Sequence, residues 1–198
     1  MTLDAELAAE LADREAGGLR RRRRLLDSPQ RAHVRVDGRD YLAFCSNDYL
    51  GLASDPRIVA AAKEGAERYG VGAGASHLIL GHAAAHHELE AALAAFTGLP
   101  QALLFSTGYM ANMGVVSALA GRGDAVFADR LNHASLNDAA LLSRAAFRRY
   151  PHNDLAALER LLATTPARRR LVIVDAVFSM DGDIAPVPEL LELCARHD

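Results

Sequence analysis

The stretch LVIVDAVFSMDGDIAP, residues 171–186, gives the clearest indication of the fold class. Its first four residues are apolar and mostly β-branched, which predicts a buried strand at 171–174. An acid, a serine and an Asp-Gly turn follow that strand directly. In open α/β sheets, ligands bind at the carboxyl ends of the strands. The residues after this strand are therefore the first candidates for a functional site.

Strands and helices alternate through the sequence that leads up to this stretch. Short apolar runs predict strands at 101–105, 125–128, 146–150 and 171–174. Helices are predicted between and around them at 83–96, 108–120, 135–143, 154–163 and 188–197. This alternation, with continuously apolar strands, predicts an α/β fold with three layers, in which helices cover both faces of a mostly parallel sheet.

The amino-terminal part has a different pattern. Leucines at helical spacing predict an amphipathic helix from residue 3 to about 24, interrupted at Gly17-Gly18. Alternating residues around an Asp-Gly pair predict a β-hairpin at 33–44, and a helix follows from Pro56 to about Tyr69. We therefore expect a helical arm and hairpin at 1–45 and the main domain at 46–198.

Composition restricts the classes of function. The net charge is −3 and the sequence pI is near 6.2, which argues against a nucleic-acid partner or an anionic membrane surface, despite the basic run at 20–24. The two cysteines lack the spacing of a zinc site or a disulfide framework. No signal sequence and no apolar run of about 20 residues is present. We expect a soluble, cytoplasmic protein.

Polar residues follow three of the predicted strands. Ser106 and Thr107 precede a helix, whose unpaired N–H groups favour a phosphate, although an ordinary helix cap is the simpler interpretation. His133 could stack on a ligand or move a proton; Ser135 suits a helix cap, whereas His133 is assigned no capping role. Ser179 could donate a hydrogen bond to a ligand oxygen. The topology should bring these three strand ends together.

Four segments in the same order resemble the α-oxoamine synthase family of pyridoxal-phosphate enzymes. They are SNDYLGL at 46–52, STGYMAN at 106–112, ADRLNHASL at 128–136 and VFSMDGDIAP at 177–186. The resemblance spans nearly the whole chain. It implies the large domain of fold-type I pyridoxal-phosphate enzymes, here incomplete at its carboxyl terminus.

The resemblance also implies roles for particular residues. Gly108 and Tyr109 correspond to the contact with the cofactor phosphate. His133 corresponds to a catalytic imidazole that stacks on the pyridine ring and also contacts the substrate, and Ser179 to a donor near the phenolic oxygen of pyridoxal phosphate. The cofactor expected from these matches is pyridoxal 5′-phosphate, and no metal is expected.

Two further matches concern the substrates. Arg20 corresponds to an arginine that contacts the acyl substrate, where its guanidinium suits a carboxylate, although a solvated helix face is the alternative. Asn47 corresponds to an asparagine near the amino-acid carboxylate, with an ordinary turn residue as its alternative. Within the family, the segments most resemble the member of biotin biosynthesis. That implies L-alanine and pimeloyl-CoA or a pimeloyl carrier protein as substrates, with decarboxylation, and a homodimer.

None of the matched family segments contains the lysine that would carry the cofactor. Lys63 is the only lysine and has no family motif around it, so we expect it at the surface and the Schiff-base lysine beyond Asp198. The 198-residue chain alone is therefore predicted to be inactive.

The alternatives are another α-oxoamine synthase that joins glycine to a different acyl-CoA, or a noncatalytic structural or interaction fragment. A metal site at His82, His86 and Glu90 is a weaker alternative, because a polar or subunit-contact face explains them better.

Overall fold

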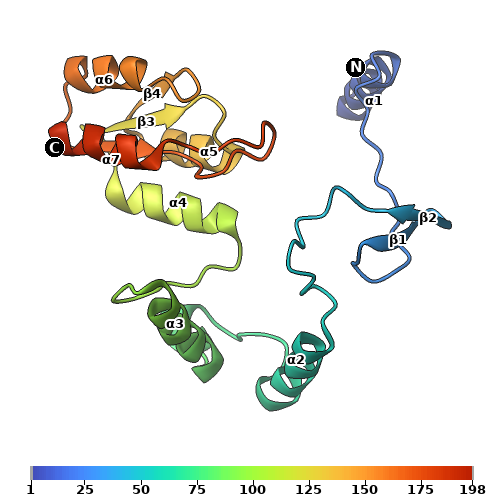
Figure 1. Ribbon diagram of the computed structural model, residues 1–198. Coiled ribbons are helices and arrows are strands. Elements are labelled where there is room, and N and C mark those ends of the chain that lie inside the picture. The colour runs from blue at the N-terminus through green and yellow to red at the C-terminus, as the bar shows by residue number, and fades with distance from the viewer. Residues whose placement is uncertain (1, 198) are drawn as a thin grey trace. The chain divides into compact units, whose positions relative to one another are not determined.

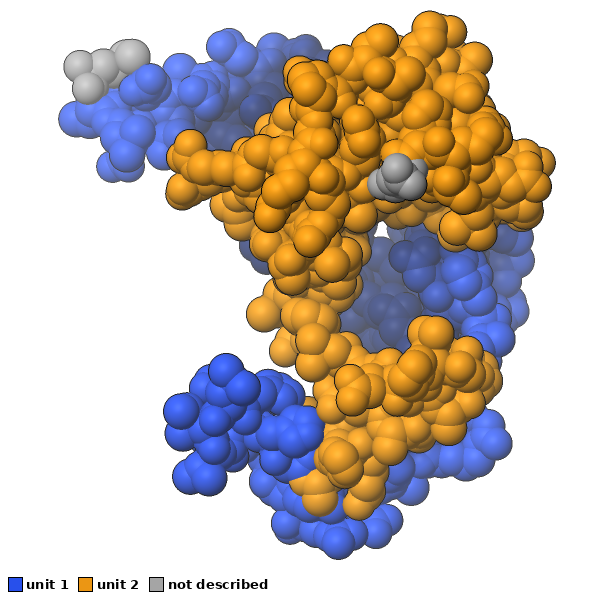
Figure 2. Space-filling view, turned by 90° about the vertical axis from the view of Figure 1, so that its left-hand side faces the viewer, with its two compact units in different colours: residues 1–83 blue, residues 84–198 orange. Residues whose placement is uncertain are grey.

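The computed structural model describes residues 2–197. The chain forms two compact units, residues 1–83 and 84–198, which Figure 2 shows in blue and orange. Figure 1 labels the helices and strands of both units along the chain. This division at residue 83 does not test the predicted domain boundary at residue 45, which stays a prediction.

A three-stranded parallel sheet forms the centre of the second unit. Strand β3 (Ala125–Asp129) lies between β4 (Ala146–Tyr150) and β5 (Arg170–Ile173). Both pairings are parallel, and all five residues of β3 are buried. The predicted strands at 125–128, 146–150 and 171–174 are confirmed to within one residue at each end. Continuous burial of β3 explains why its sequence is apolar and does not alternate with polar residues.

Helices cover both faces of this sheet (Figure 1). Helices α4 (Gly108–Leu119) and α5 (Ala134–Leu142) pack on one face, and α6 (Leu155–Thr164) and α7 (Val187–Arg196) pack on the other. Side chains alternate across β3, so two clusters form. One contains Ala125, Phe127, Tyr150, Leu158, Leu162, Leu190 and Leu193; the other contains Val116, Val126, Ala128, Leu136, Ala139, Ala140 and Ile173. The predicted three-layer arrangement with a parallel sheet is confirmed.

The strand predicted at 101–105 is wrong. Within residues 2–197, no strand pairs with this extended segment, which follows α3 (Ala84–Thr97). The backbone N–H of Leu104 instead donates to the Glu90 carboxylate over 2.8 Å. An apolar run becomes a strand only where a neighbouring strand supplies partners for its backbone groups.

The first unit contains the amino-terminal helix and a hairpin. Helix α1 runs over Leu3–Ala16 and ends at Gly17, so the predicted continuation of the helix to residue 24 is wrong. Its C-cap Gly17 donates to Asp13, and Gly18 takes a positive φ of 65°, which ends the helical hydrogen bonding. Strands β1 (His33–Val36) and β2 (Arg39–Leu42) pair antiparallel around Asp37-Gly38, as predicted.

The rest of the first unit holds a predicted helix and one unpredicted element. Helix α2 (Pro56–Tyr69) begins at the predicted proline, and the Asp55 carboxylate caps it by accepting the Arg57 N–H. A single π-helical turn, η1, covers His77–Gly81. A Cβ at Gly81 would lie 1.9 Å from the Ala75 carbonyl oxygen, so this turn requires glycine. Among the described residues, no helix is long and apolar enough to cross a membrane.

Candidate functional site

A cavity of about 520 Å³ lies at the carboxyl ends of β3 and β5. Two predicted site residues, His133 and Ser179, line it together. The other lining residues belong to the same two strand ends: Leu131, Asn132, Ala134, Asp175, Val177, Phe178, Met180 and Asp181. Two of the three strand ends that the sequence predicted to meet therefore do so.

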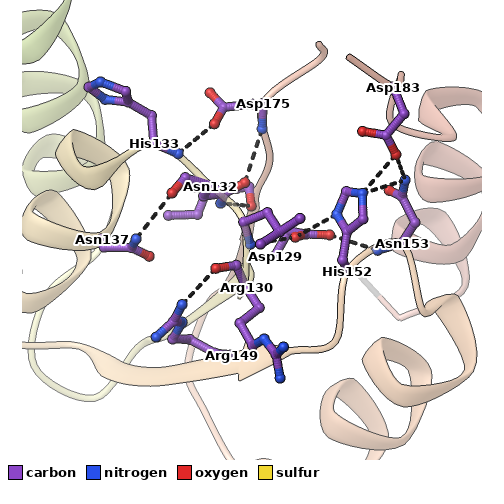
Figure 3. Close-up of polar contacts among 12 residues, drawn as sticks. Asp129, Arg130, Asn132, His133, Asn137, Arg149, His152, Asn153, Asp175 and Asp183 are labelled. Atoms are coloured by element: carbon purple, nitrogen blue, oxygen red, sulfur yellow. Dashed lines mark hydrogen bonds and ion pairs between the residues drawn. The ribbon is translucent and has the colours of Figure 1, made fainter. Parts of the chain in front are cut away.

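Asn132 joins these two strand ends by hydrogen bonds (Figure 3). Its side-chain N–H donates to the Ile173 carbonyl over 2.8 Å, and its side-chain oxygen accepts from the Asp175 N–H over 3.1 Å. The Asp175 carboxylate in turn accepts the backbone N–H of His133 over 2.6 Å. Asn132 is buried, so these bonds extend the sheet pairing and fix the backbone at His133.

His133 is the N-cap of α5, which corrects the expectation that it has no capping role. Its Nδ1 accepts the backbone N–H of Ser135 over 3.2 Å. Ser135, expected to be the cap, lies inside the first turn and is buried. Sequence reasoning missed this because histidine is not among the usual capping residues. The ring acts as a cap through its unprotonated nitrogen.

A hydrogen-bonded chain specifies which nitrogen of His133 carries a proton. The Asn112 side-chain N–H donates to the Ser135 hydroxyl oxygen over 2.8 Å, and that hydroxyl lies 2.7 Å from His133 Nδ1. Nδ1 also accepts the Ser135 backbone N–H and so carries no proton, which makes the hydroxyl the donor in its contact with Nδ1. With Nδ1 occupied as an acceptor, the neutral ring carries its proton on Nε2. His133 is thus prepared to donate a hydrogen bond through Nε2.

The amino terminus of α4 offers two free donors. Thr107 caps this helix: its hydroxyl oxygen accepts the N–H of Met110 over 3.2 Å, and its carbonyl accepts that of Ala111 over 3.1 Å. Among the described residues, the N–H groups of Gly108 and Tyr109 have no acceptor, and a Cβ placed at Gly108 would meet open space. Two unpaired donors at the positive end of a helix suit a phosphate. Thr107 can therefore cap the helix while the N–H groups of Gly108 and Tyr109 bind a phosphate.

The side chain of Tyr109 connects α4 to α5. Its hydroxyl donates to the Asp138 carboxylate over 2.6 Å. This hydrogen bond to the carboxylate raises the pKa of Tyr109. Tyr109 is therefore a neutral donor, and its ring lies at the helix terminus that carries the two free N–H groups.

Ser179 lies on a short hairpin between β5 and α7. The Phe178 N–H donates to the Asp183 carbonyl over 2.9 Å, and the Gly182 N–H donates to the Phe178 carbonyl over 2.8 Å. Gly182 adopts a positive φ of 73°, which the predicted Asp-Gly turn requires. Phe178 is buried in the core while Ser179 is exposed, so the hairpin holds the serine hydroxyl at the cavity.

The remaining predicted residues belong to the first unit. The Arg20 guanidinium forms an ion pair with Glu15 over 3.1 Å, and the side-chain oxygen of Asn47 accepts the Tyr49 hydroxyl over 3.3 Å. Lys63 is exposed on α2, as expected. Residues 2–197 contain no group of three side chains that could hold a metal ion.

Sequence reasoning missed a polar cluster beside the cavity. His152 follows the end of β4 and contacts Asp129, at the end of β3, and Asp183, in the Ser179 hairpin (Figure 3). The dipeptide His152-Asn153 follows the predicted strand at 146–150 after one residue, Pro151. The strand-end argument that selected His133 could have found it.

Comparison with known proteins defines the family of the chain. The model of the family "aminotransferase class I and II" matches residues 39–198, and the chain belongs to that family. The chain is similar to curated proteins named 8-amino-7-oxononanoate synthase. It is 71% identical to the one from Nitrosomonas europaea, over 98% of this chain and 50% of that relative. It is 69% identical to the one from Nitrosospira multiformis, over 98% of this chain and 49% of that relative. The chain spans about half the length of these relatives.

Solved structures agree with this assignment. A serine palmitoyltransferase from Sphingomonas wittichii is 33% identical, with a TM-score of 0.91, over 100% of this chain and 51% of that one. A serine palmitoyltransferase from S. paucimobilis, solved with a bound PLP–myriocin aldimine, is also 33% identical, with a TM-score of 0.90 and the same coverage. An 8-amino-7-oxononanoate synthase from Francisella tularensis is 31% identical, with a TM-score of 0.64, over 76% of this chain and 41% of that one. The chain therefore has the fold of one half of such enzymes.

Proposed function

We propose that this chain forms part of a pyridoxal-phosphate-dependent acyltransferase that makes 8-amino-7-oxononanoate for biotin biosynthesis. In the proposed reaction, L-alanine and a pimeloyl thioester give the product, carbon dioxide and the free thiol, so the amino acid loses its carboxylate as the new carbon–carbon bond forms. The observation that carries the proposal is the shared cavity of His133 and Ser179 at two strand ends, in a chain 71% identical to a synthase of that name.

The cavity and the α4 terminus fit pyridoxal phosphate. The free N–H groups of Gly108 and Tyr109 would hold its phosphate, and the His133 ring would stack on its pyridine ring. The Ser179 hydroxyl would donate to its phenolic oxygen. When bound, the cofactor supplies an electron sink for a carbanion at the amino acid's α-carbon. The Nε2–H of His133 would hold or move a proton beside the reacting atoms.

The two residues proposed to bind the substrates, Arg20 and Asn47, belong to the first unit. Arg20 would pair with the free carboxylate of the pimeloyl chain, for which a guanidinium is well suited, and Asn47 would bind the amino-acid carboxylate. The Arg20 guanidinium pairs with the Glu15 carboxylate, so a pimeloyl carboxylate would take the place of Glu15 as its partner. A pimeloyl donor is favoured over a palmitoyl donor, since identity reaches 71% with a synthase of 8-amino-7-oxononanoate and is 33% with the serine palmitoyltransferase from Sphingomonas wittichii. A homodimer in the cytoplasm and pimeloyl-CoA or a pimeloyl carrier protein as donor complete the proposal.

A chimera tests this function. Residues 1–198 replace the matching half of the Nitrosomonas europaea relative, and the purified chimera receives L-alanine with pimeloyl, succinyl, acetyl or palmitoyl thioesters. We expect 8-amino-7-oxononanoate from the pimeloyl thioester and no comparable product from the others. A folded chimera that is inactive with the pimeloyl thioester beside an active parent enzyme, or one that prefers palmitoyl thioester, would contradict the proposal. The 198-residue chain assayed alone is expected to give no product.

A further inference from the structure

His152 faces a carboxylate with each of its two ring nitrogens. Nδ1 lies 3.0 Å from an oxygen of Asp129, and Nε2 lies 2.7 Å from an oxygen of Asp183 (Figure 3). The Asp129 side chain is fully buried, while those of His152 and Asp183 are 24% and 41% exposed. The imidazole therefore bridges the end of β3 and the hairpin that carries Ser179.

The partners of Asp129 show that its carboxylate acts as an acceptor. Oδ1 accepts the Leu131 N–H over 2.8 Å as well as facing His152, and Oδ2 accepts the Asn153 N–H over 2.8 Å. Both backbone groups can only donate. A carboxylate can only accept hydrogen bonds, so Nδ1 of His152 is the donor in this contact.

In the contact with Asp183, His152 is again the hydrogen-bond donor. Oδ2 of Asp183 accepts the Asn153 side-chain N–H over 3.0 Å and lies 2.7 Å from Nε2 of His152. The Asn153 nitrogen also lies 3.3 Å from Nε2, which is longer than either distance to the carboxylate. A ring that donates from both nitrogens is an imidazolium, and two flanking carboxylates stabilise that charge.

Two kinds of contact hold the hairpin: Phe178 and Ala185 are buried in the core, and Asp183 supplies its polar link to other segments. Within the described chain, every side-chain hydrogen bond from residues 176–185 to another segment goes through Asp183. The His152 ring also packs edge-on against Phe178, with ring centroids 4.4 Å apart. Val177, Phe178 and Ser179 of the same hairpin line the cavity. Movement of the hairpin away from His152 would therefore change the cavity wall.

We infer that His152 is a positioning residue, which as an imidazolium holds the Ser179 hairpin against the ends of β3 and β4 and releases it when deprotonated. The charged groups that face the ring are Asp129 from β3 and Asp183 from the hairpin. Asp154, at the start of α6, is occupied as the cap that accepts the Ala157 N–H. The relevance to catalysis rests on the proposed function, whereas the bridge itself does not.

The pKa of His152 determines the direction in which pH should affect the bridge. The hydrogen bonds to Asp129 and Asp183 raise the pKa of His152 above its ordinary value. A raised pKa in the folded state means that the bridge is complete below the ordinary histidine value of about 6.5 and is lost as the pH rises through the raised value. The hairpin should therefore be held most firmly below about pH 6.5 and should loosen as the pH rises through the raised pKa of His152.

Two measurements on the 198-residue chain test this inference. Histidine-selective ¹⁵N NMR should show His152 mainly protonated on both nitrogens at about pH 6.5, the ordinary histidine value, and losing a proton only at higher pH, with His152→Asn identifying the signals. Hydrogen exchange of the peptide over residues 176–185, corrected for the intrinsic pH effect, should be at least about tenfold faster in His152→Asn and Asp183→Asn. Asp181→Asn, in the same hairpin but outside the bridge, should exchange as the wild type does.

Specific results would overturn the inference. A His152 that is mainly neutral at about pH 6.5, or unchanged exchange in both His152→Asn and Asp183→Asn, would contradict it. Asp183→Asn keeps the test informative if the histidine variant fails to fold, because Asp183 is partly exposed. Failure of the proposed function is seen separately, as absence of product from the chimera. If the inference and the function both hold, product formation by the chimera should fall at high pH, and Asp183→Asn should weaken that dependence.

Discussion

The Ser135 hydroxyl lies 2.7 Å from Nδ1 of His133 and directs the proton of the ring to Nε2. We predict that Ser135→Ala in the chimera lowers kcat/KM up to about tenfold, the value of one hydrogen bond of about 0.5–1.5 kcal/mol, because Nδ1 keeps only the backbone donor. Ser135→Thr retains a hydroxyl and should recover most of the activity. Ser143→Ala, at the other end of α5, removes a comparable buried hydroxyl and should leave kcat/KM unchanged.

His133 combines capping with its proposed role at the cofactor, and substitutions can separate the two. Asparagine is a favourable N-cap, so His133→Asn should change the free energy of unfolding by less than about 0.5 kcal/mol. His133→Ala should lose about 0.5–2 kcal/mol. Both should lower kcat/KM of the chimera by at least about 100-fold if the imidazole moves a proton. Urea unfolding beside kinetics checks this, and an active His133→Asn variant would show that the ring is needed only as a cap.

Gly114 allows α4 to approach Phe105 closely. A Cβ at this position would lie 2.9 Å from the Phe105 ring. Gly114→Ala should therefore cost about 1–3 kcal/mol in the free energy of unfolding, despite the better helix propensity of alanine. Gly65→Ala in α2 meets open space and should stabilise by about 0.4–1 kcal/mol. Urea unfolding of both variants is the measurement, and Phe105→Leu should relieve the Gly114→Ala defect.

Asp124 and Arg168 form a two-point ion pair at the start of the sheet. The Arg168 guanidinium donates to both carboxylate oxygens over 3.0 Å, and the Gly121 N–H donates to one of them over 2.9 Å. The Arg168 hydrogen bonds, followed by the Gly121 bond, lower the pKa of Asp124. A lowered pKa means that this stabilisation is present above the ordinary aspartate value of about 3.9 and is lost as the pH falls through the lowered value.

Substitution of Asp124 should remove that dependence. Asp124→Asn should lower the melting temperature at neutral pH, and the difference from the wild type should shrink with acidification below about pH 4. Asp40→Asn, whose side chain is 81% exposed beside Arg35, should leave the melting temperature unchanged at every pH. A difference between wild type and Asp124→Asn that is constant with pH would show that ionisation of Asp124 is not the source of its effect.

Local patterns predicted the elements whose partners lie within the chain. The run AFRRY became β4 because β3 supplies its hydrogen bonds, and the Asp-Gly pair at 37–38 made the expected hairpin. The run at 101–105 has similar apolar character but no neighbouring strand in the described residues, so periodicity alone gave the wrong answer. Strand formation depends on a partner, which a local pattern does not contain.

The site was predictable to the extent that strand ends meet in space. Topology brought His133 and Ser179 to one cavity. The same argument could have selected His152 after the predicted strand at 146–150, but its contacts with Asp129 and Asp183 join three segments and do not follow from a local pattern. The capping role of His133 was missed for a related reason. It depends on the Asn112 and Ser135 side chains, which set the protonation of the ring, and not on the residue type alone.

A crystal structure of the chimera with pyridoxal 5′-phosphate tests the central claim most directly, that the strand-end edge of this chain is the cofactor site. We predict the phosphate within hydrogen-bond distance, about 2.7–3.2 Å, of the Gly108 and Tyr109 nitrogens. The His133 ring should face the pyridine ring, and the Ser179 hydroxyl should reach the phenolic oxygen. A cofactor bound elsewhere, or one that makes no contact with α4, His133 and Ser179, would contradict the account.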